Sequence, residues 1–427
     1  MDNRMQVNVS VTSIALISLV VVGLLATCSS GEKTIKHSFE TFSDESGTVH
    51  SVSSGGPRHS SLIFSFKLVT ILIEDPEHEE SMLYRPTTIH MDEDGWIYVA
   101  DSGNRRIAVF DREGRYHHSF GRAGQGPGEF TSMSLQHVTG DSATIFDPMN
   151  SRTTVYRRDG TLLSVISQAF FFRIGVNEIH THPDGRNILI GQPLTGLSSS
   201  SPSTASCKKL RATIISPDGD TLAVVDTPKV PYGRSFVLEE YSRVGYGPIH
   251  YMGQPVLLYS PDHGLIMSTG MEPVVTWYGL DGTVDRVFTI EQERTEVTSE
   301  ERTVLMKMSR EAIENAGNEV RRAVAQRSHE LMEIPNTKDH WTRVQLDDSD
   351  FLWLKHLPDY TADKASQDLS WMVISPEGEY LGDAEWPLQN GTLSQGHLLG
   401  FVTDEETGEM TGMVFRLVPV VRALEYP

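Results

Sequence analysis

The sequence predicts an all-β fold, a six-bladed β-propeller with one helical insertion, and three observations lead to this class. Short strands alternate with Gly/Asp/Asn turns, a sequence pattern recurs after 46 residues, and turn signals mark six units but not a seventh. A period in the forties with strand-turn-strand content is typical of propeller blades. The expected domains are a signal peptide over 1–27, a flexible tether over 28–60 and the propeller over 61–427.

The first 27 residues have the pattern of a secretory signal. Arg4 provides a positive start, and residues 14–26 form an almost unbroken apolar run. At a rise of 1.5 Å per residue this run spans about 20 Å, which is short for a helix that crosses the roughly 30 Å hydrocarbon core. Cleavage before Cys28 is therefore favoured, and an uncleaved membrane helix is the alternative.

The residues that precede Cys28 resemble a bacterial lipobox, with the sequence Leu25-Ala26-Thr27-Cys28. In a lipobox the cysteine thiol is acylated before this residue becomes the new N-terminus. The resemblance implies an exported lipoprotein held on a membrane by acyl chains, and Ser29 implies sorting to the outer membrane. The other interpretation is an ordinary cleaved signal with an incidental cysteine.

The charge of the chain argues against one class of partner. Its 36 Lys and Arg residues face 57 Asp and Glu residues, for a net charge of −21. This acidic excess repels phosphate backbones, and the sequence contains no basic patch to oppose it. Nucleic acid is therefore not an expected partner. The oligomeric state is not predicted.

The first blade is expected between residues 85 and 130. Ile89 and Met91 begin its first strand, and further strands are predicted over 96–100, 107–110 and 116–120. Turns rich in Gly, Asp and Asn separate these strands. Four short strands joined in this way make one antiparallel meander.

The second blade repeats the first at an offset of 46 residues. Six pairs of like residues match at this offset: Asp101 and Asp147, Asn104 and Asn150, Arg106 and Arg152, Val109 and Val155, Phe110 and Tyr156, and Gly114 and Gly160. So many matches at a single offset are hard to reach by chance. They indicate two copies of one structural unit.

Later blades are weaker copies of this unit. Strand pairs with similar turns are found over 179–225, 256–290 and 344–381, and part of a sixth blade over 400–417. The run 62–73 has no blade of its own, so we expect it to supply the missing outer strand by pairing with 413–417. Closure by both chain ends leaves no free sheet edge in that blade.

A change of period marks the helical insertion over 298–332. It begins with the capping box Thr298-Ser299-Glu300-Glu301, and apolar residues then recur every four positions. Gly317-Asn318 is expected to divide it into two helices. The insertion is interpreted as a lid, as a helix that docks a partner, or as a decoration packed on one rim of the propeller.

The runs 101–114 and 119–130 resemble an NHL repeat. Together with the lipobox and the closing strand pair, they make the chain similar to the bacterial six-bladed β-propeller lipoproteins, a family mostly without assigned function. The resemblance implies the fold and says little about function.

A ligand site is expected at the mouth of the central channel, where the innermost strands converge. If the first strand of each blade is innermost, the polar residues near the axis are His90, Gln136, His137, His180, His182 and Gln345. Three converging histidines would make a metal site. Because side chains alternate between the two faces of a strand, about half of these residues should point away from one another. Neither a metal nor another cofactor is therefore expected.

Three arginines, Arg85, Arg105 and Arg122, flank the same rim. Forked hydrogen bonds from these guanidinium groups would hold an anionic ligand. The alternative is that they pair with the carboxylates of Asp101 and Asp147.

No catalytic residue is assigned, because the common catalytic signatures are absent from the sequence. The glycines between 121 and 128 superficially resemble a phosphate cradle. Pro127 and the Glu129-Phe130 pair follow where a helix N-terminus would be needed, so a tight loop between blades is expected instead.

The leading functional hypothesis is a non-enzymatic, lipid-anchored propeller that binds a protein, peptide or glycan at the cell envelope. The alternative is a metal-dependent hydrolase or lyase of the gluconolactonase or amidating-lyase kind, with its site in the central channel. Those families use a Glu, Asn and Asp set, or a His set, on matched inner strands, and the blade alignment yields no such carboxylate-amide set. RNA binding, as in some animal NHL proteins, is disfavoured by charge and by export.

Overall fold

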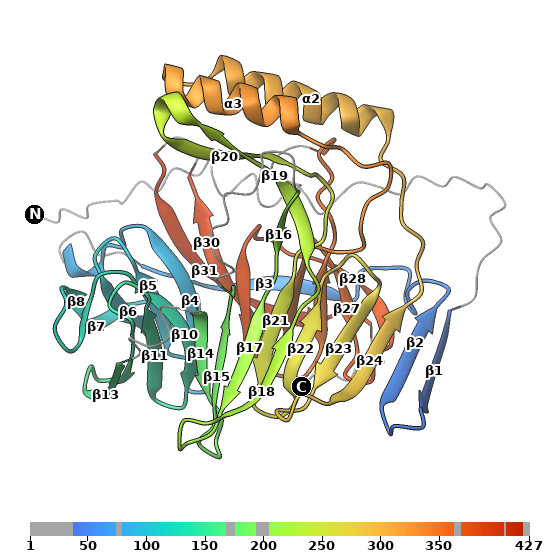
Figure 1. Ribbon diagram of the computed structural model, residues 1–427. Coiled ribbons are helices and arrows are strands. Elements are labelled where there is room, and N and C mark those ends of the chain that lie inside the picture. Colours follow the sequence, from blue (N-terminus) through green and yellow to red (C-terminus); the bar gives the residue numbers. More distant parts are fainter. Residues whose placement is uncertain are drawn as a thin grey trace, which may run out of the picture. The chain divides into compact units, whose positions relative to one another are not determined.

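The computed structural model describes residues 37–73, 79–167, 176–193, 205–362, 369–404 and 407–421. Within them, six antiparallel four-stranded sheets follow one another as six blades, and one sheet is extended by two further strands (Figure 1). The predicted class, an all-β six-bladed β-propeller, is confirmed. Cys28 and the signal peptide lie outside the described residues.

Blades 1 to 3 are each built from four strands in chain order. Their bounds are β4 (Pro86–Met91), β5 (Ile97–Asp101), β6 (Arg106–Phe110) and β7 (Tyr116–Phe120); β10 (Ser134–Thr139), β11 (Ser142–Asp147), β12 (Arg152–Arg157) and β13 (Leu162–Ser167); and β14 (Val176–Thr181), β15 (Asn187–Gly191), β17 (Arg211–Ile215) and β18 (Thr221–Asp226). A short parallel pair, β8 (Arg122–Ala123) and β9 (Glu129–Phe130), lies between blades 1 and 2.

Blades 4 and 5 are again built in chain order, whereas blade 6 takes its outer strand, β3, from the N-terminal part of the chain. Their bounds are β21 (Val256–Ser260), β22 (Gly264–Ser268), β23 (Val274–Tyr278) and β24 (Val284–Ile290); β25 (Arg343–Leu346), β26 (Leu352–Lys355), β27 (Ser370–Ile374) and β28 (Tyr380–Glu385); and β29 (Gly391–Ser394), β30 (His397–Thr403), β31 (Met410–Pro419) and β3 (Phe64–Ile71). Pairing of β3 with β31 runs from Phe64 opposite Pro419 to Ile71 opposite Met413, which confirms the predicted closure.

The tether predicted over 28–60 is wrong for the part that forms strands. β1 (Ser38–Ser43) and β2 (Val49–Ser54) form a hairpin, and β2 adds in parallel to the outer strand of blade 4. The buried positions of β2 are Ser51 and Ser53, each 1% exposed. Small side chains let this ribbon approach blades 4 and 5 closely, so it is held by backbone pairing without the apolar periodicity that identifies a strand in sequence.

The helical insertion has the predicted form. α2 (Ser299–Glu314) and α3 (Glu319–Leu331) are separated near Gly317, and Asn318 is the N-cap of α3. In the capping box, the Glu301 N–H donates to Thr298 Oγ1 (3.2 Å) and the Thr298 N–H donates to Glu301 Oε2 (2.9 Å). Neither helix is long and apolar enough to cross a membrane, and the same holds throughout the described residues.

A second small sheet supports these helices. It consists of β16 (Ala205–Lys208), β19 (Val230–Leu238) and β20 (Arg243–Pro248), with the 3-10 turn η3 (Glu239–Tyr241) between the last two strands. The helix pair lies over β19 and β20 (Figure 1). The Glu333 N–H donates to Pro248 O (2.9 Å) and the His250 N–H donates to Glu333 O (3.0 Å), so the sheet and the helix pair form one layer, here called the cap.

All parts of the cap leave the propeller on one face. They are inserted between β15 and β17, between β18 and β21, and between β24 and β25. In an antiparallel four-stranded blade, the connections from second to third strand and from fourth strand to the next blade lie at the end where the first strand begins. We call this the insertion face.

The core lies between neighbouring blades. Blades 5 and 6 share an aromatic cluster in which the rings of Trp371 and Trp386 stack with centroids 4.1 Å apart, and Trp353 lies beside them. All three side chains are at most 1% exposed. Burial of aromatic area on this scale is a major contribution to stability.

Candidate functional site

The repeated motif of blades 1 and 2 forms a structural latch. Asp101, at the end of β5, accepts hydrogen bonds from the Tyr84 N–H, Asn104 Nδ2 and Arg106 Nε, each at 2.8 Å. Its side chain is fully buried. Because Tyr84 precedes β4, the carboxylate ties the entering strand to the turn after β5 of the same blade.

The second copy of the latch repeats the backbone and asparagine contacts of the first, but not the arginine contact. Asp147 accepts from the Thr131 N–H (2.8 Å) and from Asn150 Nδ2 (2.7 Å). The neighbouring residue of each turn, Arg105 or Ser151, is left-handed, with φ of 57° and 49°. The most regular motif of the sequence therefore has a structural role. Its carboxylates already accept hydrogen bonds from donors of the protein itself.

The three rim arginines do not form a common group. Arg105 donates to Ser102 O (3.1 Å) and to Thr131 O, and Arg122 pairs with Glu129 (2.8 Å). Arg85 has its guanidinium carbon 5.3 Å from the centroid of the Tyr84 ring. Two of the three are thus engaged within the protein, although neither pairs with Asp101 or Asp147 directly.

The glycine loop between blades 1 and 2 is closed by its own carboxylate. Glu129 Oε2 accepts from the Gly126 N–H (2.8 Å), and a Cβ added at Gly124 would lie 2.1 Å from the same oxygen. Hydrogen bonds from Gly126 and Arg122 lower the pKa of Glu129. The place that a phosphate would take is filled, which agrees with the predicted inter-blade loop.

The structure brings together several of the predicted channel residues. His90, His137 and His180 stand on β4, β10 and β14, the first strands of three consecutive blades. The rings of His137 and His180 stack with centroids 5.8 Å apart, and Tyr259 of β21 continues the row 5.1 Å from His180. His182 Nδ1 lies 2.8 Å from the Tyr259 hydroxyl. We call these five residues the histidine row.

Two histidines of the row, His90 and His137, are uncharged at neutral pH. Burial lowers the pKa of His90 to about 4. Burial, together with the neighbouring His180 and His90, lowers the pKa of His137 to about 4. Neutral imidazoles act as hydrogen-bond donors and acceptors, not as anion-binding cations. Within the described part of the chain, no three His, Cys, Asp or Glu side chains are grouped so as to hold a metal ion.

Two predicted glutamines lie apart from the histidine row. Gln136 Nε2 donates to Ser134 Oγ on its own strand (2.9 Å). Gln345 Nε2 donates to Gly391 O (3.1 Å) and so links the innermost strands of blades 5 and 6. Gly391 in turn lines a cavity that the sequence did not reveal.

This cavity has a volume of about 1030 Å³ and opens on the insertion face between blades 6 and 1. It is bordered by the start of β4, the start of β29 and the connection from β30 to β31. Its polar side chains are hydroxyls and amides with few charges: Thr87, Thr88, Gln389, Asn390, Thr392, Thr403, Asp404 and Arg343.

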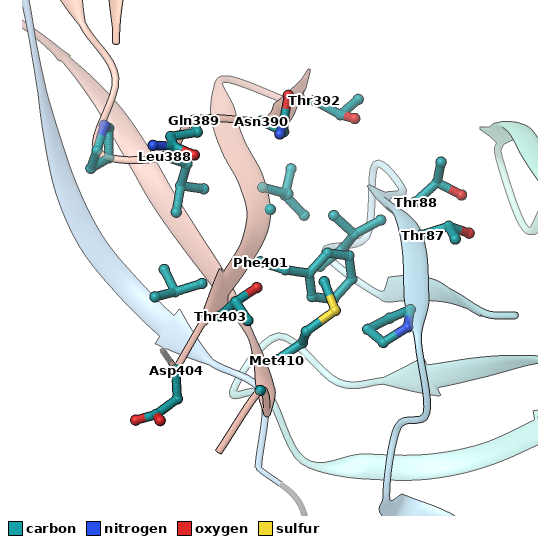
Figure 2. Close-up of a pocket in the computed structure, with 18 of the residues that line it drawn as sticks. Thr87, Thr88, Leu388, Gln389, Asn390, Thr392, Phe401, Thr403, Asp404 and Met410 are labelled. Atoms are coloured by element: carbon teal, nitrogen blue, oxygen red, sulfur yellow. The ribbon is translucent and has the colours of Figure 1, made fainter. Parts of the chain in front are cut away.

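Apolar side chains complete the wall of the cavity. Figure 2 shows Phe401 and Met410 beside Thr87 and Thr88, with Gln389, Asn390 and Thr392 across the opening. Arg343 Nη1 donates to Asn390 Oδ1 (3.3 Å), which orients that amide. Thr88 Oγ1 is buried and has no hydrogen-bond partner within the described residues.

Sequence reasoning missed this cavity for a local reason. β29 has only four residues, too few to show an alternating pattern, and the sixth blade was recognised from β30 and β31 alone. The Asn390-Gly391 pair at the start of β29 is a turn signal that would have placed the missing innermost strand. The convergence of β29 with β4 is a contact between opposite ends of the chain.

Comparison with known proteins supports the fold. A family model described as a 6-bladed beta-propeller matches residues 62–178, less than half of the chain. No protein in a search of curated sequences matches.

Solved structures with a related fold are distant in sequence. A presumed exported protein from Bacteroides fragilis is 11% identical, with 84% of this chain and 98% of that chain covered and a TM-score of 0.46. A member of the DUF4221 family from Bacteroides vulgatus is 10% identical, with 84% and 99% covered and a TM-score of 0.48. Virginiamycin B lyase from Staphylococcus aureus is 9% identical, with 82% and 99% covered and a TM-score of 0.36. At these values the similarities carry no argument about function.

Proposed function

We propose that this chain is an exported, lipid-anchored propeller that binds a glycan in the cavity between blades 6 and 1. The observation that carries the proposal is the lining of that cavity, in which neutral hydroxyl and amide groups surround Phe401. Sugar hydroxyls are matched by groups that both donate and accept, and an aromatic ring packs against the apolar face of a sugar.

The size and position of the cavity support this assignment. Ligand pockets commonly hold about 300–1,000 Å³, so the cavity has room for a ligand of more than one ring. It lies on the insertion face, where all parts of the cap emerge, and it is built from strands that the closed propeller holds rigidly. A rigid site with few charges selects a neutral polar ligand over an ionic one.

The test measures binding of the purified full chain to a panel of fluorescent envelope oligosaccharides. Phe401→Ala and Thr403→Val should each weaken binding of the best oligosaccharide at least tenfold. Thr411→Val, an exposed residue of β31 outside the cavity, serves as the matched control and should leave affinity unchanged. Equal affinity of all three variants, or no oligosaccharide binding by the parent chain, would contradict the proposal.

Anchoring is tested separately. Cys28→Ala should release the protein from the membrane fraction, because the acyl chains can no longer be attached. A Cys28→Ala chain that stays with the membrane would favour the uncleaved apolar run as the anchor.

The second candidate, a metal-dependent hydrolase or lyase, is favoured by one observation, the stacking of His137 and His180 in the channel. Elemental analysis of the purified chain separates the two functions. One zinc or copper ion per chain that is lost in His137→Gln would favour the metal-dependent enzyme over the glycan-binding module. A metal-free chain that binds oligosaccharide supports the binding module.

A further inference from the structure

The cap carries the most exposed large apolar side chain of the described residues. Val244, on β20, is 74% exposed, and its cross-strand partner Val237 is 61% exposed. Exposed apolar residues that cluster mark interaction surfaces, because leaving them in water forgoes the free energy of burial. This strand pair is therefore a candidate contact surface.

β20 packs tightly against α3 at Gly247, its one buried residue. A Cβ added at Gly247 would lie 2.4 Å from Leu331 Cβ, so strand and helix touch at the end of α3. Toward the start of α3, a groove of about 570 Å³ lies between the two elements. Val244, Val320 and Val324 provide its apolar lining. We call it the cap groove.

Two arginines line the cap groove. Arg243 and Arg321 are both exposed, and neither guanidinium forms an ion pair within the described residues. Glu239, Glu240 and Glu319 lie nearby, but none of them lines the groove, and Glu319 accepts a hydrogen bond from Tyr241 (3.3 Å). The charged side chains that line the groove are therefore both positive.

This local charge runs against the net charge of −21 of the whole chain. At physiological ionic strength, charges more than about 8 Å apart are largely screened, so a bound group responds to the arginines beside it more than to the distant excess. A guanidinium without a partner offers a carboxylate two parallel hydrogen bonds.

We propose that the cap groove docks an acidic peptide segment of a partner protein. An apolar side chain of the segment fills the space between Val244, Val320 and Val324, and its carboxylates pair with Arg243 and Arg321. A concave groove suits a side chain better than the flat surface of a bilayer, and the arginines favour an acidic segment over a basic or neutral one. This site is distinct from the cavity proposed to bind glycan.

The experiment selects random 12-residue peptides displayed on phage against the immobilised full chain, and then measures the selected peptides by fluorescence anisotropy. The expected peptides are enriched in Asp and Glu around one or two large apolar residues. The Arg243→Ala, Arg321→Ala double variant and Val244→Ser should each weaken binding at least tenfold. Arg322→Ala, a neighbouring exposed arginine of α3 outside the groove, is the matched control and should leave affinity unchanged.

Three results would overturn the proposal. The first is a selection without acidic enrichment. The second is selected peptides whose affinity does not change in the double variant. The third is binding to vesicles containing phosphatidylglycerol that the double variant abolishes while no peptide is selected, which would assign the groove to a lipid surface. Unchanged thermal unfolding of the variants shows that the cap is intact.

Discussion

The two halves of the propeller protect their outer edges differently. In blades 4 to 6 the N-terminal residues cover the outer strands: β2 pairs with β24, the N–H groups of Arg58 and His59 donate to the carbonyls of Tyr380 and Leu381 at β28, and β3 completes the last blade. In blades 2 and 3 the outer strands β13 and β18 are sheet edges within the described residues.

The edges that remain also carry apolar side chains. On β13 and β18 these include Ile166, 47% exposed, and Leu222, 51% exposed. Sheet edges of this kind are where other chains can add. The chain itself shows such an addition once, where its own β2 joins blade 4.

The interiors of the two halves differ as well. Blades 1 and 2 fix their inner strands with the buried carboxylates of Asp101 and Asp147, whereas blades 5 and 6 bury the cluster of Trp353, Trp371 and Trp386. Blades 1 and 2 are thus organised by a local motif that both of them contain. In the other half, the tryptophans pack with Ile63 and Phe64, which lie far earlier in the chain. Variants in blades 1 and 2 should therefore lower stability through lost hydrogen bonds, and variants in blades 5 and 6 through lost apolar burial.

The largest effect is expected in the aromatic half. Trp371→Ala removes a fully buried ring stacked on Trp386, and should lower the free energy of unfolding by about 3–5 kcal/mol. Urea unfolding measures the change. Trp96→Ala, whose side chain in blade 1 is only partly buried, is the control and should cost clearly less. Similar losses of stability in Trp371→Ala and Trp96→Ala would show that the aromatic cluster of blades 5 and 6 is no more important to stability than a partly buried ring in blade 1.

The next effect is expected at the latch of blade 2. Asp147→Ala leaves the partly buried N–H groups of Thr131 and Asn150 without their acceptor, and should cost about 2–3 kcal/mol in the same measurement. Asp141→Ala, an exposed carboxylate 3.5 Å from Arg157, is the matched control and should change stability by less than about 0.5 kcal/mol. Equal losses of stability in Asp147→Ala and Asp141→Ala would show that the latch does not stabilise the fold.

The histidine row should make the half with blades 1 to 3 sensitive to acid. The folded-state pKa of His137 is about 4, below the ordinary value of 6.5, so the unfolded chain binds more protons between these two pH values. The contribution of this residue to stability is therefore complete above about pH 6.5 and falls as the pH decreases toward 4, with a loss on the order of 2 kcal/mol at pH 5.

His137→Gln tests the acid sensitivity, because glutamine keeps a polar side chain without titrating. Unfolding of parent and variant in urea at pH 7 and pH 5 gives the comparison. The stability difference between the two chains should shift in favour of the variant at pH 5. A difference that is the same at both pH values would show that His137 is not buried in its neutral form.

The smallest effect is expected where the N-terminal residues meet blade 5. Arg58 pairs with Glu379 at 3.1 Å, but its side chain is 51% exposed. Arg58→Ala should lower stability by no more than about 0.5–1 kcal/mol, because exposed ion pairs are screened by water and salt. Hydrogen exchange of β2 should remain slow in the variant, since backbone pairing with β24 holds the strand. Rapid exchange there would mean that the ion pair anchors the N-terminal residues.

Much of the fold was predictable because its signals are local. The turns of blades 1 and 2, the capping box at Thr298 and the helix boundary at Asn318 each depend on residues within a few positions of one another. The pairing of β3 with β31 followed from counting strands, since one blade lacked its outer member. The placement of His90, His137 and His180 on first strands was predicted, whereas their arrangement in a row with Tyr259 was not.

The remaining features depend on partners far away in the sequence. The serine-rich residues 49–54 form a strand because they pair with the edge of blade 4. The segment has no apolar periodicity from which this strand could have been predicted. The cavity beside Phe401 exists because β29 meets β4, and the cap groove exists because α3 lies along β20. The sequence by itself thus determined the repeating unit, its turns and the inserted helices, since these follow from short-range hydrogen bonding and apolar periodicity. Only the tertiary structure decided which edges are covered and where the cavities lie, because those properties arise from surfaces that distant segments create together.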